Sequence, residues 1–405
     1  MKRIPTNPFV HDVLLTKLME LDSLRDGKLP RAFVQVIGLF GWAMIVGGAT
    51  SQARARSSYT TTELERRPGF VGFYTARLSE GGTVTGYSRR LSGPTEYFPT
   101  VWPSGGQANF LGLPPLAIGG IAETLLSDGR YVGSIRYVQA DDAVPVVWDT
   151  DGSRRELPLP NRFGWASLGV GSVIVGGTVP NSDIAVWQND TLLGIVSDLP
   201  GSARASLDIN SHGTYVGVWS GFNSTGNYVY GGFIGDGLSV RLVSIPGWEQ
   251  TPAYGINDDG AIVGIHLTIG FTRVGYLARG DGAVSLSPLP GGVESPVWAI
   301  NNHNDMVGLS TDIFGNETAT VYFNGSLVPT DMNTLVDLTQ LDAQGHDVRL
   351  VRGIDVNDAG QILVEAGDFT AGVYRYYVLT PIPDASAAAS IGLLTLWHVR
   401  GRRRR

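Results

Sequence analysis

Apolar and polar residues alternate along this chain in a phrase that returns at a regular interval. Three full copies read I-N-S-H-G-T-Y-V-G (209–217), I-N-D-D-G-A-I-V-G (256–264) and I-N-N-H-N-D-M-V-G (300–308). A fourth, V-N-D-A-G-Q-I-L-V, covers 356–364, weaker copies begin at Leu78 and Leu126, and a reduced one ends at Gly176. The polar centre of each copy predicts a tight turn, and the apolar residues after it predict a strand.

The spacing of these phrases predicts the fold. Their last glycines, Gly86 to Gly308, follow one another at intervals of 41 to 47 residues, and Val364 takes the glycine position 56 residues later. Each interval also contains an aromatic third strand, such as P-T-V-W (99–102), and a fourth strand that ends near Leu-Pro. Periods of about 40 to 50 residues with four strands are typical of β-propeller blades.

Seven phrases predict an all-β propeller of seven four-stranded blades. The last blade has three strands in sequence, at 352–356, 361–365 and 374–379, and residues 59–64 form an isolated strand before the first phrase. We expect residues 59–64 to complete the last blade and close the ring, which protects the exposed edges. An open solenoid is the alternative, but it needs polar capping repeats, and the sequence shows none.

Within the phrases, seven residues are predicted to shape the hairpin turns, because Asn and Gly tolerate left-handed backbone. They are Asn210, Gly213, Asn257, Gly260, Asn301, Asn357 and Gly360. On this interpretation the phrase is scaffolding, and recognition belongs to the variable stretches between phrases.

Composition narrows the function classes. The 405 residues contain no cysteine, so disulfides and thiolate chemistry are excluded, and 54 glycines agree with many turns. Residues 1–55 carry a net charge of +3 and residues 381–405 a net +4, which leaves −14 for residues 56–380. The three lysines, Lys2, Lys17 and Lys28, all precede the repeats. An acidic body without lysine argues against a nucleic-acid partner.

The N-terminal residues 1–55 resemble a secretory signal. An apolar run, 32–49, follows Lys28 and Arg31, and small residues lead to Ala53-Arg54-Ala55. This order predicts cleavage by signal peptidase after Ala55, with Ala53 and Ala55 at the recognised positions. The long stretch before the run leaves the translation start open between Met1 and Met19, and a retained membrane anchor is the rival interpretation.

The C-terminal residues 381–405 have three parts in order. Pro381-Ile382-Pro383 comes first, an apolar run (387–399) follows, and arginines end the chain. The basic residues of this last part are Arg400, Arg402, Arg403, Arg404 and Arg405. The run is too short for an ordinary spanning helix but allows transient membrane insertion, with the arginines on the cytoplasmic side. A disordered basic tail is the alternative.

Two family resemblances follow from these motifs. The tripartite tail is similar to the PEP-CTERM sorting signal of bacterial envelope proteins, with Ile382 where that family has Glu; the resemblance implies processing by an exosortase-like enzyme. The repeats, 59–380, resemble the HAF repeats of probable extracellular bacterial proteins, although H-A-F itself is missing. Together they imply a protein of the cell envelope or the extracellular space.

No catalytic constellation stands out in the sequence. His212 and His303 occupy equivalent turns and are candidates for a shared metal ion. Histidines in turns are more often solvated, so this interpretation is the weaker one. Asp208 and Asp355 precede the Asn turns and permit calcium, but each Asp is expected to face away from its turn, and no Glu stands at the bidentate position. The expectation is therefore no cofactor.

Two groups of side chains remain as candidates for sugar chemistry. The carboxylates Glu123, Asp141, Asp142 and Asp183 would serve glycoside hydrolysis if they met on one face. The recurring Trp102, Trp148 and Trp187 fit core packing better than a sugar platform. The sequence therefore predicts an exported binding or display module whose contacts are extracellular polysaccharide or surface proteins. A secreted glycosidase or polysaccharide lyase is the alternative.

Overall fold

The computed structural model describes residues 59–90, 96–137, 143–201, 203–222, 226–268, 272–280, 282–341 and 345–383. In this part of the chain the regular elements are β-strands and three short 3-10 helices, so the all-β class is confirmed. The helices are η1 (Phe323–Gly325), η2 (Met332–Thr334) and η3 (Leu338–Gln340). The predicted signal segment with Ala53 and Ala55, and the tail from residue 384 with its arginines, lie outside the described residues.

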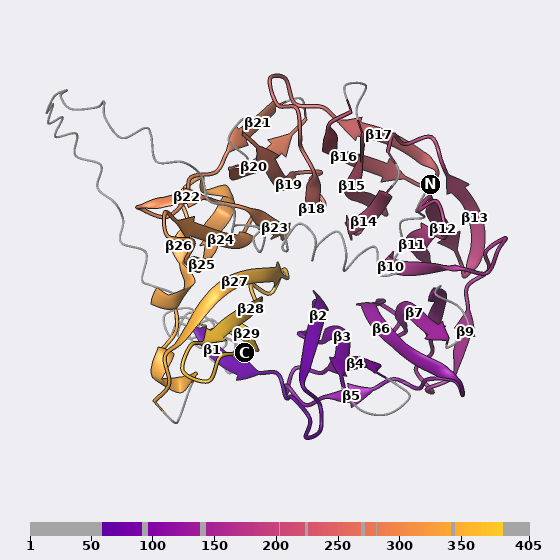
Figure 1. Cartoon of the computed structure of the whole chain (residues 1–405), viewed down its shortest axis with the longest axis horizontal. Coiled ribbons are helices and arrows are strands. Elements are labelled where there is room, and N and C mark those ends of the chain that lie inside the picture. Colours follow the sequence, from indigo (N-terminus) through magenta and orange to yellow (C-terminus); the bar gives the residue numbers. More distant parts are fainter. Residues whose placement is uncertain are drawn as a thin grey trace, which may run out of the picture.

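The sheets stand side by side around a common centre, each with one strand nearest to that centre (Figure 1). Sheets that radiate from a central axis are the architecture of a β-propeller. The inner strands are β2 (Gly72–Leu78), β6 (Ala117–Leu125), β10 (Gly164–Val170), β14 (Ala203–Ile209), β18 (Ala253–Ile256), β23 (Val297–Ile300) and β27 (Val348–Val356).

Three sheets follow the expected antiparallel order outward from the inner strand, β10 to β13, β14 to β17 and β18 to β21. Each inner strand leads through a hairpin turn to the second strand, because the phrase places turn residues between two apolar runs. Their outer strands are β11 (Val173–Thr178), β12 (Ile184–Gln188), β13 (Thr191–Val196), β15 (Thr214–Phe222), β16 (Tyr228–Asp236), β17 (Ser239–Val243), β19 (Ile262–Leu267), β20 (Arg273–Arg279) and β21 (Gly282–Ser285).

Two sheets depart from a uniform four-stranded unit. The first two repeats form one eight-stranded sheet, since β4 and β6 share a single parallel pair, Tyr97 with Gly119. In the sixth repeat the first strand is split into β22 and β23 around Pro296, which has no N–H for the ladder. The strands are β3 (Val84–Arg89), β4 (Tyr97–Trp102), β5 (Asn109–Phe110), β7 (Tyr131–Tyr137), β8 (Ala143–Trp148), β9 (Arg154–Glu156), β22 (Gly292–Glu294), β24 (Met306–Asp312), β25 (Glu317–Tyr322) and β26 (Thr330–Asp331).

The first and last described strands lie in one sheet. β1 (Tyr59–Glu63) pairs antiparallel with β29 (Val373–Pro381), next to β28 (Ile362–Asp368) and β27. Tyr59 lies opposite Pro381 and Glu63 opposite Tyr377. The strand predicted at residues 59–64 therefore lies in the sheet of the last repeat, as expected.

The hydrophobic core lies between neighbouring sheets. One cluster joins Val147 of β8 to Ile174 of β11. Trp102, Trp148 and Trp187 are fully buried, and their indole N–H groups donate to the carbonyl oxygens of Glu65, Gly112 and Pro158. The structure thus confirms core packing for the recurring tryptophans.

The last glycine of the phrase allows a close approach of two backbones. A Cβ on Gly86, Gly176 or Gly217 would lie 1.9–2.1 Å from a carbonyl oxygen of the inner strand. The cause is a register shift in each inner strand, for example between Ser206 and Asp208, that pushes this carbonyl toward the second strand. In the seventh repeat the glycine lies on the inner strand instead: Gly353 is paired with Val364, which takes the position of the last glycine of the phrase.

Candidate functional site

The hairpin turns after the inner strands meet at one end of the propeller, where they surround a central cavity of about 580 Å³. We call these turns the turn ring. Its members that line the cavity are Ser79–Gly81, Leu126, Ser127, Gly129, Asn210, Ser211, Asn257, Asp258, Asn301, Asn302 and Asp358. The sequence pattern predicts that the phrase is scaffolding, and the structure places its turns around this cavity.

Each asparagine of the full phrases caps its own turn. The Oδ1 atom of Asn210 accepts from the backbone N–H groups of His212 and Thr214 at 3.1 and 3.0 Å. Gly213, Gly260 and Gly360 have positive φ in these turns, which L side chains rarely adopt. In the copy without glycine, Asn304 takes this conformation with φ 61°.

The same asparagines also join each repeat to the next. The Nδ2 group of Asn210 donates to the carbonyl oxygen of Asn257 at 3.1 Å, and Asn257 donates likewise to Asn301. Asn301 donates to Asn357, and Asn357 donates to the carbonyl oxygen of Ser79, both at 2.9 Å. The phrase needs asparagine because one side chain must both accept and donate. Its oxygen accepts hydrogen bonds from its own turn, and its amide group donates to the turn of the next repeat.

A second row of hydrogen bonds runs beside the first. The backbone N–H of Ser211 donates to Asp258 at 2.8 Å, and that of Asp258 donates to Asn302 at 2.8 Å. The N–H of Asn302 donates to Asp358 at 2.7 Å, and that of Asp358 to Glu80 at 2.9 Å. Asn302 shows that a neutral amide oxygen serves as well as a carboxylate in this row.

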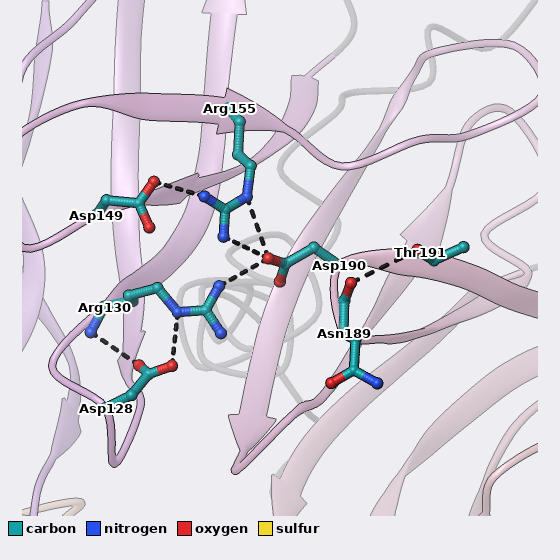
Figure 2. Close-up of polar contacts among 7 residues, drawn as sticks. All are labelled: Asp128, Arg130, Asp149, Arg155, Asn189, Asp190 and Thr191. Atoms are coloured by element: carbon teal, nitrogen blue, oxygen red, sulfur yellow. Dashed lines mark hydrogen bonds and ion pairs between the residues drawn. The ribbon is translucent and has the colours of Figure 1, made fainter.

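Ion pairs connect the second and third repeats, whose turns lack asparagine. Figure 2 shows Asp190, between β12 and β13, facing Arg130 and Arg155 of the second repeat. Arg130 lies 2.7 Å from Asp190 and 2.6 Å from Asp128, and Arg155 lies 2.6 Å from Asp149. Burial alone would raise the pKa of Asp128, but the hydrogen bonds and charge of Arg130 outweigh it and lower the pKa.

Charged side chains lie inside the cavity. The Arg77 guanidinium of β2 approaches Asp208 of β14 to 3.1 Å, which links strands 131 residues apart in sequence. The Oδ2 atom of Asp208 accepts from the N–H of Ile256, and that of Asp355 from the N–H of Leu78, both at 2.8 Å. Each of these two Asp side chains, which the sequence predicts to face away from its own turn, therefore reaches the next inner strand.

Burial dominates the electrostatics of these carboxylates. It raises the pKa of Asp208 to about 6, although Arg77 and the N–H of Ile256 act in the opposite direction. It also raises the pKa of Asp355, against the effect of Arg77. Burial raises the pKa of Glu80 as well, and the nearby Asp358 and Asp355 charges add to it. The cavity is a place where negative charge accumulates.

The other residues singled out from the sequence lie apart from this cavity. Glu123 is buried in β6 and Asp183 precedes β12, and neither lines the cavity, while 141–142 lie outside the described residues. His212 is largely exposed, with Nδ1 3.9 Å from Asp258. The described residues contain no group of three metal-binding side chains, and calcium stays untested.

The opposite end of the propeller carries exposed aromatic side chains. We call this end, where the second strands end and the third begin, the loop face. Phe222 (73% exposed), Phe314 (81%) and Phe369 (61%) lie there at the ends of β15, β24 and β28. Tyr228 and Tyr374, at the start of the third strands β16 and β29, are also exposed: Tyr228 is the first residue of β16 and Tyr374 the second of β29.

Two neighbouring hairpins of the loop face present their phenylalanines on fixed turns. Asp312 accepts from the N–H groups of Phe314 and Asn316 at 2.8 and 2.9 Å. Asp368, which is 56 residues later at the same repeat position, accepts from the N–H of Ala371 at 2.8 Å, next to Phe369. Carboxylates that cap their own turns reduce the freedom of the tips.

Arginines accompany aromatic rings on this face. The guanidinium carbon of Arg349 lies 5.6 Å from the Phe369 ring centre, and that of Arg162 lies 5.5 Å from the Tyr137 ring. In the first repeat Arg89 lies 5.7 Å from the Tyr97 ring. Flat apolar rings beside planar hydrogen-bond donors form a surface suited to ligands with both apolar and polar faces. Neither the sequence period nor the motifs pointed to these positions.

Solved structures with a related arrangement have low sequence identity to this chain. The β-propeller domain of the Trilobed protease from Pyrococcus furiosus is 8% identical, with a TM-score of 0.49 and coverage of 76% of this chain and 93% of that one. The lectin BP39L from Burkholderia pseudomallei is 12% identical, with a TM-score of 0.43 and coverage of 77% and 99%. No protein-family model and no curated protein matches the sequence.

Proposed function

We propose that this chain is an exported protein of the cell envelope that acts as a binding or display module. Its loop face binds extracellular polysaccharide at the cell surface. The observation that carries the proposal is the pair of exposed phenylalanines, Phe314 and Phe369, held on Asp-capped turns of adjacent repeats. Aromatic rings fixed before binding lose little conformational entropy when a sugar ring stacks on them. Arg349 and its ion-pair partner Asp347 lie beside Phe369 and offer hydrogen bonds to hydroxyl or acidic groups.

A closed ring of seven blades is the finer architecture in this proposal. Its support is the pairing of β1 with β29 and the bonds from Asn357 and Asp358 back to Ser79 and Glu80, which continue the pattern from the last repeat to the first. A closed ring leaves no free sheet edge for aggregation at the surface of a cell. It also holds the loops of separate repeats at constant distances.

The polysaccharide proposal is tested on Phe314→Ala and Phe369→Ala variants of the whole chain. In a glycan screen with purified extracellular polysaccharides, we expect the double variant to bind at least about tenfold more weakly, which corresponds to about 1.4 kcal/mol. The matched control is Val328→Ala, which removes an exposed apolar side chain outside the loop face. Equal binding by wild type and double variant would contradict the proposal.

An enzyme remains the second candidate because two carboxylates, Asp208 and Asp355, line one cavity with Arg77. Paired carboxylates with separated roles are the machinery of glycoside hydrolysis. The same screen therefore includes analysis of released products. If wild type releases a product and Asp208→Asn or Asp355→Asn does not, the result supports an enzyme. If the glycan is bound but not cleaved, the result supports a binding module.

Export and sorting form the last part of the proposal. The predicted partners are signal peptidase at Ala55 and an exosortase-like enzyme that acts near Pro381 and Pro383, with the arginines Arg400 and Arg402–Arg405 as a membrane stop. In the described part of the chain no helix is long and apolar enough to cross a bilayer. Deletion of residues 400–405 is expected to release protein into the medium or change its processed size in cell fractions; unchanged retention would count against a sorting tail.

A further inference from the structure

The central cavity combines buried carboxylates with an acidic rim. Among its lining residues the charged ones are Arg77 and five carboxylates, which are Glu80, Asp208, Asp258, Asp355 and Asp358. Asp208 pairs with Arg77, which shows that the cavity accommodates a guanidinium group. Asp355, only 9% exposed, is held by the N–H groups of Leu78 and Val356 and forms no ion pair among the described residues. The charge of Arg77 acts on Asp355, but the described hydrogen bonds to its carboxylate come from backbone N–H groups, so the carboxylate can still accept from a second guanidinium group.

The described chain ends beside this cavity. β29 runs toward the turn ring, and the Nε2 group of Gln361 in the seventh repeat donates to Thr380 Oγ1 at 3.1 Å. A Cβ on Gly360 would lie 3.6 Å from Pro381. The inner strand is two strand spacings away, about 10 Å. The chain therefore leaves the propeller, at Pro383, on the acidic side.

The residues that follow have the complementary charge. Residues 384–405 contain one carboxylate, Asp384, and five arginines within the last six positions. A random coil of 17 residues, the separation of Pro383 and Arg400, has an end-to-end distance of roughly 20–25 Å, which exceeds the two strand spacings to the inner strand. Tethering at this length gives a local concentration near the millimolar range, so modest intrinsic affinity suffices.

We propose that the arginine-rich segment Arg400–Arg405 docks into the central cavity, where its guanidinium groups pair with Asp355 and with the carboxylates of the turn ring. Guanidinium groups bind carboxylates through two parallel hydrogen bonds, and a recessed site strengthens them relative to open solvent. The docked segment sequesters the arginines before any membrane or processing enzyme engages them. This inference goes beyond the polysaccharide proposal and holds whether or not the loop face binds glycans.

The experiment uses the full chain, which has no cysteine and therefore accepts labels at chosen positions. Spin labels are placed at Ser127→Cys on the cavity mouth and Gly401→Cys within the arginine cluster. Docking predicts a narrow distance distribution at low salt that becomes broad at about 1 M salt, where the Debye length is about 3 Å. A broad distribution at low salt would overturn the proposal.

Charge variants separate docking from folding. The triple variant E80Q, D258N and D358N removes three cavity charges but keeps the oxygen acceptors, as natural Asn302 does in the same row. We expect the narrow component to be lost and trypsin cleavage within residues 400–405 to accelerate about tenfold, equivalent to about 1.4 kcal/mol. The matched control, D151N, D259N and D337N, removes three carboxylates outside the cavity lining and should change neither readout.

A tail variant covers the case in which the triple variant fails to fold. Replacement of Arg402, Arg403, Arg404 and Arg405 by Gln leaves the propeller unchanged and should abolish the narrow component. If that variant keeps the narrow distribution, the arginines do not drive docking and the proposal fails. If the wild-type tail is free but a synthetic hexa-arginine peptide binds the cavity, the site belongs to another cationic partner, and the tail assignment is likewise overturned.

Discussion

The ionisation of Asp208 depends on burial, on an ion pair and on a hydrogen bond. Asp208 lies on an inner strand, pairs with Arg77 across the cavity and accepts a hydrogen bond from Ile256. Burial raises its pKa to about 6, which means that loss of water outweighs these favourable contacts. Asp355 and Arg77 are the charged groups that face it in the cavity. Its charge therefore carries an energetic cost at neutral pH.

That cost predicts a pH dependence of stability. In the unfolded chain an aspartate titrates near about 3.9, so the folded state holds the proton of Asp208 to higher pH. The free energy of unfolding should therefore fall as pH rises from about 4 to about 6, and the loss is complete above that range. NMR titration of the Asp208 carboxyl should give a pKa of about 6, and Asp208→Asn should flatten this part of the stability curve.

The control for this measurement is Asp337→Asn. Hydrogen bonds from Thr339 lower the pKa of Asp337, so its contribution changes at lower pH and leaves the interval from about 4 to 6 unaffected. A carboxyl titration for Asp208 near the ordinary aspartate value would contradict the electrostatic account of the cavity.

At the scale of the element, the phrase encodes the two strands of a hairpin and the close contact between their backbones at the last glycine. The turn residues reverse the chain, and the final glycine admits the bulged carbonyl of the inner strand. Gly217 illustrates the constraint, since a Cβ there would lie 2.1 Å from the Ala205 oxygen and 2.5 Å from the Phe233 ring. The glycine therefore marks a packing requirement that returns from the first repeat to the sixth, since a Cβ on Gly86 or on Gly308 would also lie within about 2 Å of a carbonyl oxygen.

A Gly217→Ala substitution tests that requirement. We expect a loss of about 1–3 kcal/mol in the free energy of unfolding, because the backbone of the inner strand must shift. Urea unfolding measures the change, with Gly112→Ala as control because nothing lies within 4 Å of the added methyl. Equal midpoints for the two variants would show that the bulge relaxes at little cost.

At the scale of the whole molecule, the contacts that matter join residues far apart in sequence. Asn357 donates to Ser79 across 278 positions, and Tyr59 lies opposite Pro381. Such contacts have a high entropic cost before they form, because a long segment of chain must be ordered first. The stability of the assembly therefore depends strongly on the junction between the first and last strands.

A disulfide at this junction tests the proposed closure. Thr60 and Thr380 face each other in the β1–β29 pair, and the chain contains no other thiol. If the ring closes here, the Thr60→Cys/Thr380→Cys variant should oxidise readily and unfold at higher temperature, with a gain of up to about 5 kcal/mol from the long loop. Each single-cysteine variant is the control. Failure to cross-link the folded protein would place β1 elsewhere.

By itself, the sequence determined the local structure of this protein. The spacing of I-N-x-x-G and of the aromatic third strands predicted the strands, turns and propeller class, because hairpins depend on neighbours within about ten residues. It also marked the asparagines and glycines of the turns, including Asn257 and Gly260.

Only the tertiary structure decided what those turns do together. Arg77 and Asp208 belong to different repeats and show no sequence relation, yet the fold places them 3.1 Å apart. Phe314 and Phe369 likewise lie on one face because each follows the second strand of its repeat, at the end away from the turns of the phrase. The period and the apolar pattern describe residues that are close in sequence. The cavity and the loop face depend on contacts between separate repeats, which a local pattern does not contain.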